Sequence, residues 1–91
     1  MYLYLGQTTM VAHRDIIGIF DLDNTSWSHR TRRFLAQAQQ TGTLVALGHD
    51  LPRSFLLCGD GRHSTVYMSQ FNTATLIRRV EQDKLEQEER T

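Results

Sequence analysis

The sequence holds few of the residues that build covalent cross-links, metal sites or membrane spans. Cys58 is its only cysteine, which excludes an internal disulfide and a cysteine-based zinc site. It ends the apolar run Phe55–Cys58, so we expect a buried side chain rather than a nucleophile. The 4 histidines lack the spacing of metal ligands, and no stretch approaches the ~20 apolar residues of a transmembrane helix. Residues 1–10 lack the basic start and long apolar core of a signal peptide. We therefore expect a cytoplasmic domain with no metal, no cofactor and no membrane contact.

Lysine and glutamate are missing from most of the chain, so the charge is unevenly placed. Residues 1–80 carry 8 Arg against 5 Asp, a net charge of 8 − 5 = +3. Residues 81–91 carry 2 basic against 5 acidic side chains, a net charge of 2 − 5 = −3. Arginine makes forked, bidentate contacts with phosphate that lysine cannot make. This distribution predicts a mildly basic domain over 1–80 and an acidic tail, helical or disordered, over 81–91.

Hydrophobic periodicity and turn residues predict the element order β-β-β-α-β-β-β-α. This order indicates an α+β fold, a small and mostly antiparallel sheet with two helices. Asp15–Phe20 is apolar on both faces, as in a central strand, and Gly42 should end the first helix. Leu76, Ile77 and Val80 should face inward on the second. The predicted segments are a hairpin over 2–12, strands over 15–20, 43–47, 53–58 and 63–69, a helix over 26–41, and a helix opened by Asn72 or Thr73.

The segment Asp21-Leu22-Asp23-Asn24-Thr25 resembles the nucleophile motif of haloacid-dehalogenase-type phosphatases. In those enzymes the first aspartate attacks phosphorus and the second handles the proton. Such an enzyme needs a doubly wound sheet with sites at several strand ends, and no later acidic pair is available here to hold magnesium. We favour a strand that runs into a helix capped by Asn24, Thr25 or Ser26, with both aspartates near its positive end. The chain is therefore not expected to be an enzyme.

Arginines gather at positions where they could meet an anionic partner. Arg30, Arg32 and Arg33 fall in the first two turns of the first helix, where positive charge opposes the helix dipole by ~0.3–1 kcal/mol each. A cluster that costs stability hints at an anionic partner, although surface arginine is common. Arg14 precedes a strand and Arg53 begins one, so both could point toward a partner at strand ends, or they could pair with the neighbouring Asp15 or Asp50.

Six short segments, spread over about residues 1–80, form a recognisable set when their order and spacing are taken together. They are Leu3-Tyr4-Leu5-Gly6, Arg14-Asp15-Ile16-Ile17-Gly18-Ile19-Phe20-Asp21, Thr31-Arg32-Arg33-Phe34-Leu35, Leu51-Pro52-Arg53-Ser54-Phe55, Val66-Tyr67-Met68-Ser69 and Thr75-Leu76. Together they resemble the RemA/RemB extracellular-matrix regulator family, and its RemB branch in particular. The resemblance leaves the acidic tail outside.

The resemblance implies a single LytTR-like domain that assembles into a closed ring and contacts DNA through arginines on the rim. Arg14 matches an arginine that the RemA branch uses for DNA. The adjacent arginine pair of that branch falls near Asp50-Leu51, so only Arg53 remains here. We expect a homo-oligomeric transcriptional regulator of biofilm-matrix genes that binds DNA through these two residues, together with Arg30, Arg32 and Arg33. It would take no small-molecule substrate. The alternative is a protein-interaction regulatory module without direct DNA binding.

Overall fold

Alternating apolar residues at the start of the chain form a β-hairpin. The computed structural model describes residues 1–6, 8–23, 28–60 and 62–89, with 83–89 described as backbone only. Strands β1 (Tyr2–Gly6) and β2 (Thr9–Ala12) pair antiparallel in a sheet of their own, which confirms the predicted hairpin. Because side chains alternate between the faces of a strand, Leu3, Leu5 and Val11 point into the core.

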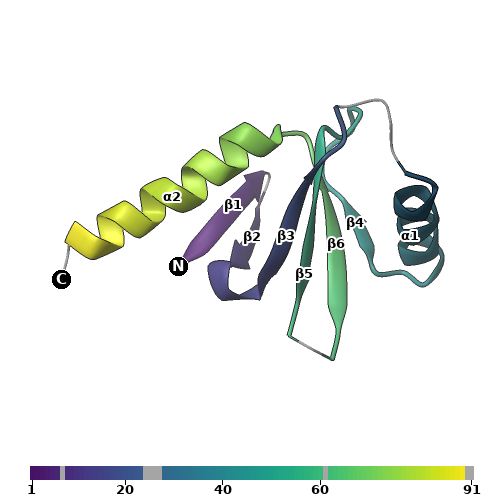
Figure 1. Cartoon of the computed structure of the whole chain (residues 1–91), viewed down its shortest axis with the longest axis horizontal. Helices are drawn as coiled ribbons and strands as arrows, with labels where there is room; N and C mark the ends of the chain where they lie inside the picture. Colours follow the sequence, from purple (N-terminus) through teal and green to yellow (C-terminus); the bar gives the residue numbers. More distant parts are fainter. Residues whose placement is uncertain (7, 24–27, 61, 90–91) are drawn as a thin grey trace.

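The remaining strands form one four-stranded sheet, in the order β3-β5-β6-β4 (Figure 1). β3 pairs with β5 and β5 with β6 in antiparallel fashion, whereas β4 and β6 are parallel. The element order and the mostly antiparallel α+β architecture are confirmed. The strands are β3 (Ile16–Asp21), β4 (Leu44–Ala46), β5 (Ser54–Gly59) and β6 (Ser64–Ser69).

The strand predicted to be central, β3, lies at an edge of this sheet. Ile17 is 62% exposed and Phe20 44% exposed, so the prediction of a central strand was wrong. The apolar character on both faces has another cause. Ile16 and Ile19 face the core beneath the hairpin, while the ring of Phe20 stacks on Phe55 across the other face. β5 is the inner strand that antiparallel partners flank on both sides.

Helix α1 (His29–Gln40) begins three residues after the predicted start at 26. Ser28 is its N-cap, because the Ser28 hydroxyl accepts a hydrogen bond from the Thr31 N–H at 3.1 Å. The predicted caps at 24–26 lie outside the described residues, as does Trp27. Gly42 follows the helix with φ +78°, a conformation that glycine adopts without strain, and this confirms the predicted end.

Helix α2 (Thr73–Glu89) begins at the position predicted from its polar residues. The Asn72 side chain accepts the Thr75 N–H at 2.8 Å, so Asn72 is the capping residue. Leu76 is fully buried and Val80 packs against the same core, but Ile77 is 45% exposed and its predicted inward position was wrong. The helical backbone continues through Glu89. Among the described residues, no helix is long and apolar enough to cross a membrane.

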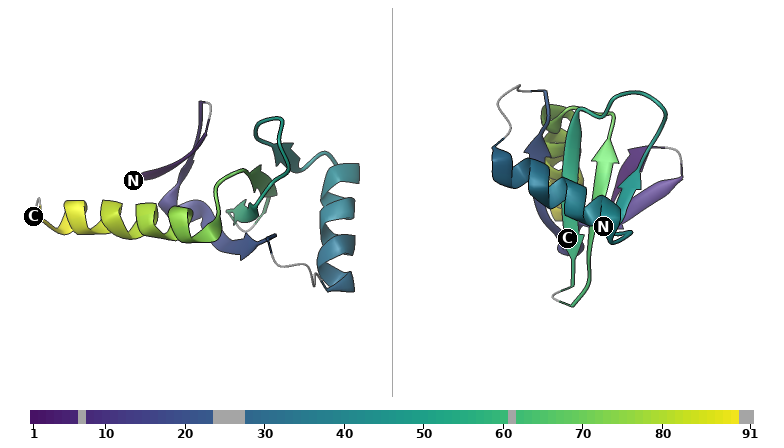
Figure 2. Two further views of the ribbon diagram at one scale, coloured as in Figure 1. Left: turned by 90° about the horizontal axis from the view of Figure 1, so that it is seen from above. Right: turned by 90° about the vertical axis from the view of Figure 1, so that its right-hand side faces the viewer.

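The four-stranded sheet has a hydrophobic core on each face. The β1–β2 hairpin and α2 cover one face, and α1 covers the other (Figure 2). Leu56 of β5 belongs to the first core and its neighbour Phe55 to the second, because neighbouring residues of a strand face opposite ways. The hairpin-side core consists of Leu3, Leu5, Val11, Leu47, Leu56, Cys58 and Leu76, and the α1-side core of Leu22, Leu35, Ala38, Phe55 and Val66.

Candidate nucleic-acid interface

Arg14 lies in the 3-10 turn, His13–Asp15, that connects β2 to β3. Its side chain is exposed and lines a hollow of about 420 Å³ at the end of β5. Asp60, in the β5–β6 turn, lines the same hollow. The backbone N–H groups of His63 and Arg62 donate to the Asp60 carboxylate at 3.0 Å, which lowers the pKa of that group. The hollow therefore carries charges of both signs.

Arg53 directly precedes β5, and the backbone on both sides of it holds it in place. Its N–H donates to the Ser69 carbonyl at 2.8 Å, and its carbonyl accepts the Leu22 N–H at 2.9 Å. The Arg53 side chain is 53% exposed and forms an ion pair with Asp23, with Nη2 at 3.1 Å and Nε at 3.2 Å from Oδ2. An exposed pair of this kind contributes about 0–1 kcal/mol to stability. A phosphate could therefore replace the carboxylate at low cost.

The fold places Arg14 and Arg53 at opposite ends of the sheet. Ile16, which follows the Arg14 turn, pairs with Cys58, whereas Asp21 pairs with Ser54, next to Arg53. β3 is 6 residues long, so at about 3.3 Å per residue the two arginines lie on the order of 20 Å apart. One subunit therefore does not bring the two predicted contacts together.

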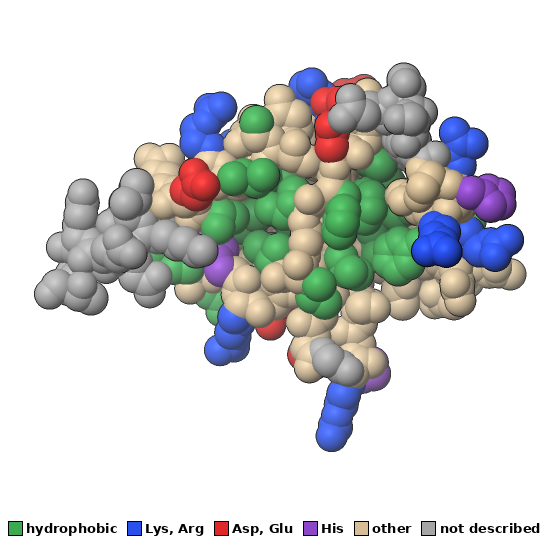
Figure 3. Space-filling model, viewed as in Figure 1, with side chains coloured by type: hydrophobic (Ala, Val, Ile, Leu, Met, Phe, Trp, Pro, Cys, Tyr) green, Lys and Arg blue, Asp and Glu red, His purple; other side chains and the backbone are tan. Residues whose placement is uncertain are grey.

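The three arginines of α1 form a separate group. Arg30, Arg32 and Arg33 are exposed, and the first turn of the helix holds no acidic residue to offset them. Figure 3 shows positive side chains gathered beside a histidine at this end of the molecule. Neither these arginines nor Arg14 forms an ion pair with a carboxylate among the residues that the structure describes.

The two aspartates of the phosphatase-like motif take structural roles. The Asp21 carboxylate accepts the Asp23 N–H at 2.7 Å, which fixes the turn after β3. Asp23 pairs with Arg53 as described above. Within the described ranges, no group of three histidine, cysteine or acidic side chains could hold a metal ion.

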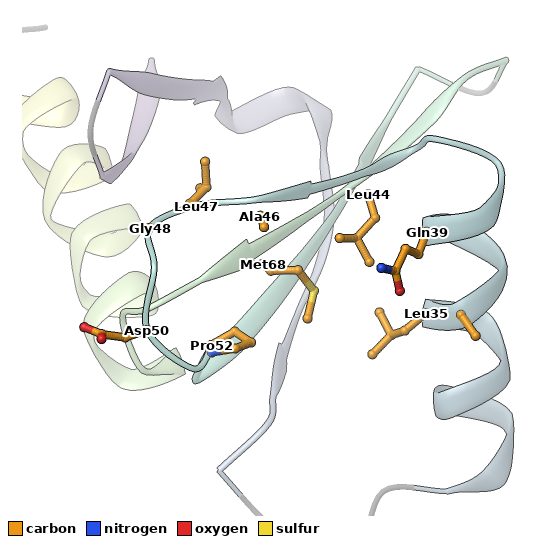
Figure 4. Close-up of a pocket in the computed structure, with 10 residues that line it drawn as sticks. Leu35, Gln39, Leu44, Ala46, Leu47, Gly48, Asp50, Pro52 and Met68 are labelled. Carbon is orange, nitrogen blue, oxygen red and sulfur yellow. The ribbon is translucent and has the colours of Figure 1, made fainter.

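A second hollow, of about 380 Å³, lies between α1 and the β4 side of the sheet (Figure 4). Leu35 and Gln39 of the helix point toward Met68, whereas the Asp50 carboxylate points away from the hollow. Its lining is mostly apolar, and Asp50 is the only titratable residue among the described residues that line it. The hollow therefore brings no pair of acid–base groups together.

Cys58 is buried in the hairpin-side core, as its apolar neighbours predicted. Burial raises the pKa of the thiol to about 11, and the negative charge of Asp15 adds to the rise. A thiol that stays protonated at neutral pH is a poor nucleophile and a poor metal ligand. Cys58 is therefore a packing residue.

Two features of these surfaces did not emerge from the sequence pattern. Arg62 is exposed in the β5–β6 turn, at the same end of the sheet as Arg14. The stretch Gly59-Asp60-Gly61-Arg62 between two predicted strands is typical of a turn, but a turn motif does not indicate which surface its arginine joins. Phe20 and Phe34 lie partly exposed beside the arginines of α1. The exposure of these two rings depends on which strand lies at the edge of the sheet, and the sequence pattern does not give that order.

No protein-family model matches the chain, and no curated protein matches it at a significant level. The resemblance to the RemA/RemB family therefore stays a prediction.

Proposed function

We propose that the chain is a non-enzymatic, cytoplasmic, homo-oligomeric regulator that binds DNA, with biofilm-matrix genes as its targets. Arg14 and Arg53 are the proposed phosphate contacts. The α1 arginines, Arg30, Arg32 and Arg33, are further proposed contacts and form a separate group. A single subunit offers few contacts, so binding depends on a ring or other oligomer that repeats them along the duplex.

The observation that carries the proposal is the exposure of unpaired arginine on the domain. Arg14 and the α1 group have no carboxylate partner among the described residues, and every positive side chain over 1–80 is an arginine. DNA affinity of this kind depends on the number of phosphates that Lys and Arg neutralise. Contacts of this kind position a protein on the duplex, while sequence preference comes from base contacts or from DNA deformation.

The fold supports a non-enzymatic role. A phosphatase of the haloacid-dehalogenase type needs its nucleophile at the carboxyl end of a strand within a parallel, doubly wound sheet. Here Asp21 ends an edge strand whose neighbour runs antiparallel. The second aspartate of the motif is engaged by Arg53. Absence of turnover on phosphate esters stays a prediction.

A second candidate, a protein-interaction module without DNA contact, is favoured by the Arg53–Asp23 ion pair. A guanidinium that already has a carboxylate partner offers less attraction to phosphate than a free one. In this alternative Arg53 is a structural residue that ties the turn after β3 to the start of β5.

The experiment compares the binding of a ~30-base-pair duplex to wild-type protein and four variants by fluorescence anisotropy, over a salt series. Arg14→Ala and Arg53→Ala should each weaken binding. The slope of log affinity against log salt concentration should fall by about 1 for each phosphate contact that is removed. Asp23→Asn should strengthen binding about 2- to 5-fold, because the competing carboxylate is gone. Arg78→Ala, an exposed arginine on α2, is the matched control and should bind as the wild type does.

Native mass by light scattering accompanies each titration, so that a loss of assembly is not mistaken for a loss of contacts. If an intact oligomer fails to bind the duplex even at low salt, the DNA-binding proposal is wrong and the interaction module takes its place. Binding that is unchanged in both Arg14→Ala and Arg53→Ala would contradict the assignment of the contacts.

A further inference from the structure

An apolar groove lies between α1 and the β3–β5 side of the sheet. It is a hollow of about 260 Å³, smaller than the ~300–1,000 Å³ of pockets for drug-sized ligands. The ring of Phe20 stacks on Phe55 with centroids 4.8 Å apart at 16°, yet Phe20 stays 44% and Phe34 39% exposed. We call this the α1 groove, and its lining is Phe20, Arg30, Thr31, Phe34, Phe55 and Leu57.

Positive charge lies along the helical side of the α1 groove. Arg30 lines it directly, and Arg32 and Arg33 are exposed on the same two helical turns. The N-terminus of a helix carries partial positive charge, so these side chains oppose the dipole of their own helix. Exposed aromatic side chains with arginines around them are the composition that marks protein–protein interfaces. The groove therefore suits an anionic partner that also brings apolar surface.

The opposite end of the molecule has the complementary composition. α2 projects away from the sheet and ends at Glu89, at the far end of a molecule that is 44 Å along its longest axis (Figures 1 and 2). Residues 81–89 carry 5 acidic and 1 basic side chains, a net charge of 1 − 5 = −4, with one apolar residue, Leu85. The last turn of α2 holds no basic residue, so this charge also opposes the dipole of its own helix.

We propose that residues 81–89 of one copy dock in the α1 groove of a second copy. The two surfaces lie at opposite ends of one chain, so they meet only between chains. Docking places the negative end of α2 next to the positive end of α1. It also brings the acidic side chains of residues 81–89 close to the arginines of α1. The contact is head-to-tail, and it generates a ring if the rotation closes and a filament if it does not. The inference rests on the self-association within the proposed function but not on DNA binding.

The test is charge reversal and charge exchange in the full-length chain. Arg30→Glu with Arg33→Glu reverses the groove, and Glu86→Lys with Glu89→Lys reverses the tail. Light scattering at low salt, over a concentration series that reaches tens of micromolar protein, measures assembly. In each double variant, the protein concentration at which half of the chains are assembled should rise on the order of 10-fold. An equimolar mixture of the two variants should restore assembly, with the two variants alternating, because each groove then meets a tail of opposite charge. The fourfold charge exchange should restore the wild-type mass. Arg78→Glu, on the exposed middle of α2, is the control.

Assembly that is unchanged in both double variants, or not restored in the exchange, would overturn the inference. So would a wild-type chain that stays monomeric at every concentration and salt. Wild-type assembly should weaken as salt rises, and this measurement needs no variant to fold. If the groove instead holds unpaired bases, the arginine reversal abolishes DNA binding while the native mass stays at the wild-type value. If the wild-type oligomer binds no DNA, yet its assembly responds to the charge reversals as described, only the proposed function would be overturned.

Discussion

The four-stranded sheet is covered on one face by the hairpin and α2 and on the other by α1 alone, and the two faces are buried to different degrees. On the hairpin side the leucines of three separate elements are almost completely enclosed. On the α1 side a single helix of 12 residues packs over β4 and β6, which leaves Phe20 of the β3 edge partly open. Two covering elements enclose the hairpin-side face, whereas one helix leaves the part of the other face around Phe20 uncovered. A partner can dock on this uncovered part.

Truncation of one leucine on each face should measure this difference directly. Leu76→Ala removes a fully buried side chain of α2 and should cost about 3 kcal/mol of unfolding free energy. Leu35→Ala removes a side chain of α1 that is 7% exposed and lies beside an open hollow. It should cost about 2 kcal/mol, because the site can relax or admit water. Urea unfolding gives both values.

Equal or reversed costs in this pair would mean that the α1 side is sealed as tightly as the hairpin side. Leu51→Ala is the control, because Leu51 is 88% exposed and its removal should change stability little.

The tight hairpin side should also show in the pH dependence of stability through Cys58. Its thiol has a pKa raised to about 11 in the folded protein, against 9.0 for an ordinary thiol. Between these values the unfolded chain has released a proton that the folded chain still holds, so stability falls as pH rises. The expected loss is about 2 kcal/mol from about pH 8 to pH 11, measured by urea unfolding against Cys58→Ala.

The Cys58→Ala variant should lack this part of the loss, since other groups titrate equally in both proteins. A parallel fall in the two proteins would show that water reaches the thiol. Rapid alkylation of Cys58 in the folded state near neutral pH would lead to the same conclusion.

The helix caps offer the smallest test of the comparison. Asn72→Ala and Ser28→Ala each remove one side-chain acceptor from a helix N-terminus and should cost about 1 kcal/mol. Asn72→Ala should cost more, because α2 is fixed by a buried core at Leu76 and cannot shift to a new start. Thermal unfolding of both variants, with Arg78→Ala as an exposed control on α2, checks the order. A larger effect of Ser28→Ala would indicate that the α1 face carries more of the stability than its burial suggests.

Local patterns in the sequence determined the elements and their order. Alternation near residues 2–12 determined the hairpin, the polar residues at 72 and 73 located the start of α2, and Gly42 marked the end of α1. These features depend on neighbouring residues alone, so the sequence contains the information that predicts them. The burial of Cys58 followed in the same way from its apolar surroundings.

The tertiary structure decided which strands became neighbours and therefore what lies on the surface. Apolar residues on both faces of β3 predicted an inner strand, but pairing with β5 alone left it at the edge and left Phe20 exposed. The same pairing placed Arg14 and Arg53 at opposite ends of the sheet. It also brought Arg53 into an ion pair with Asp23 rather than with Asp50, which is closer in the sequence. Strand order depends on contacts between residues far apart in the chain, which a local pattern does not encode.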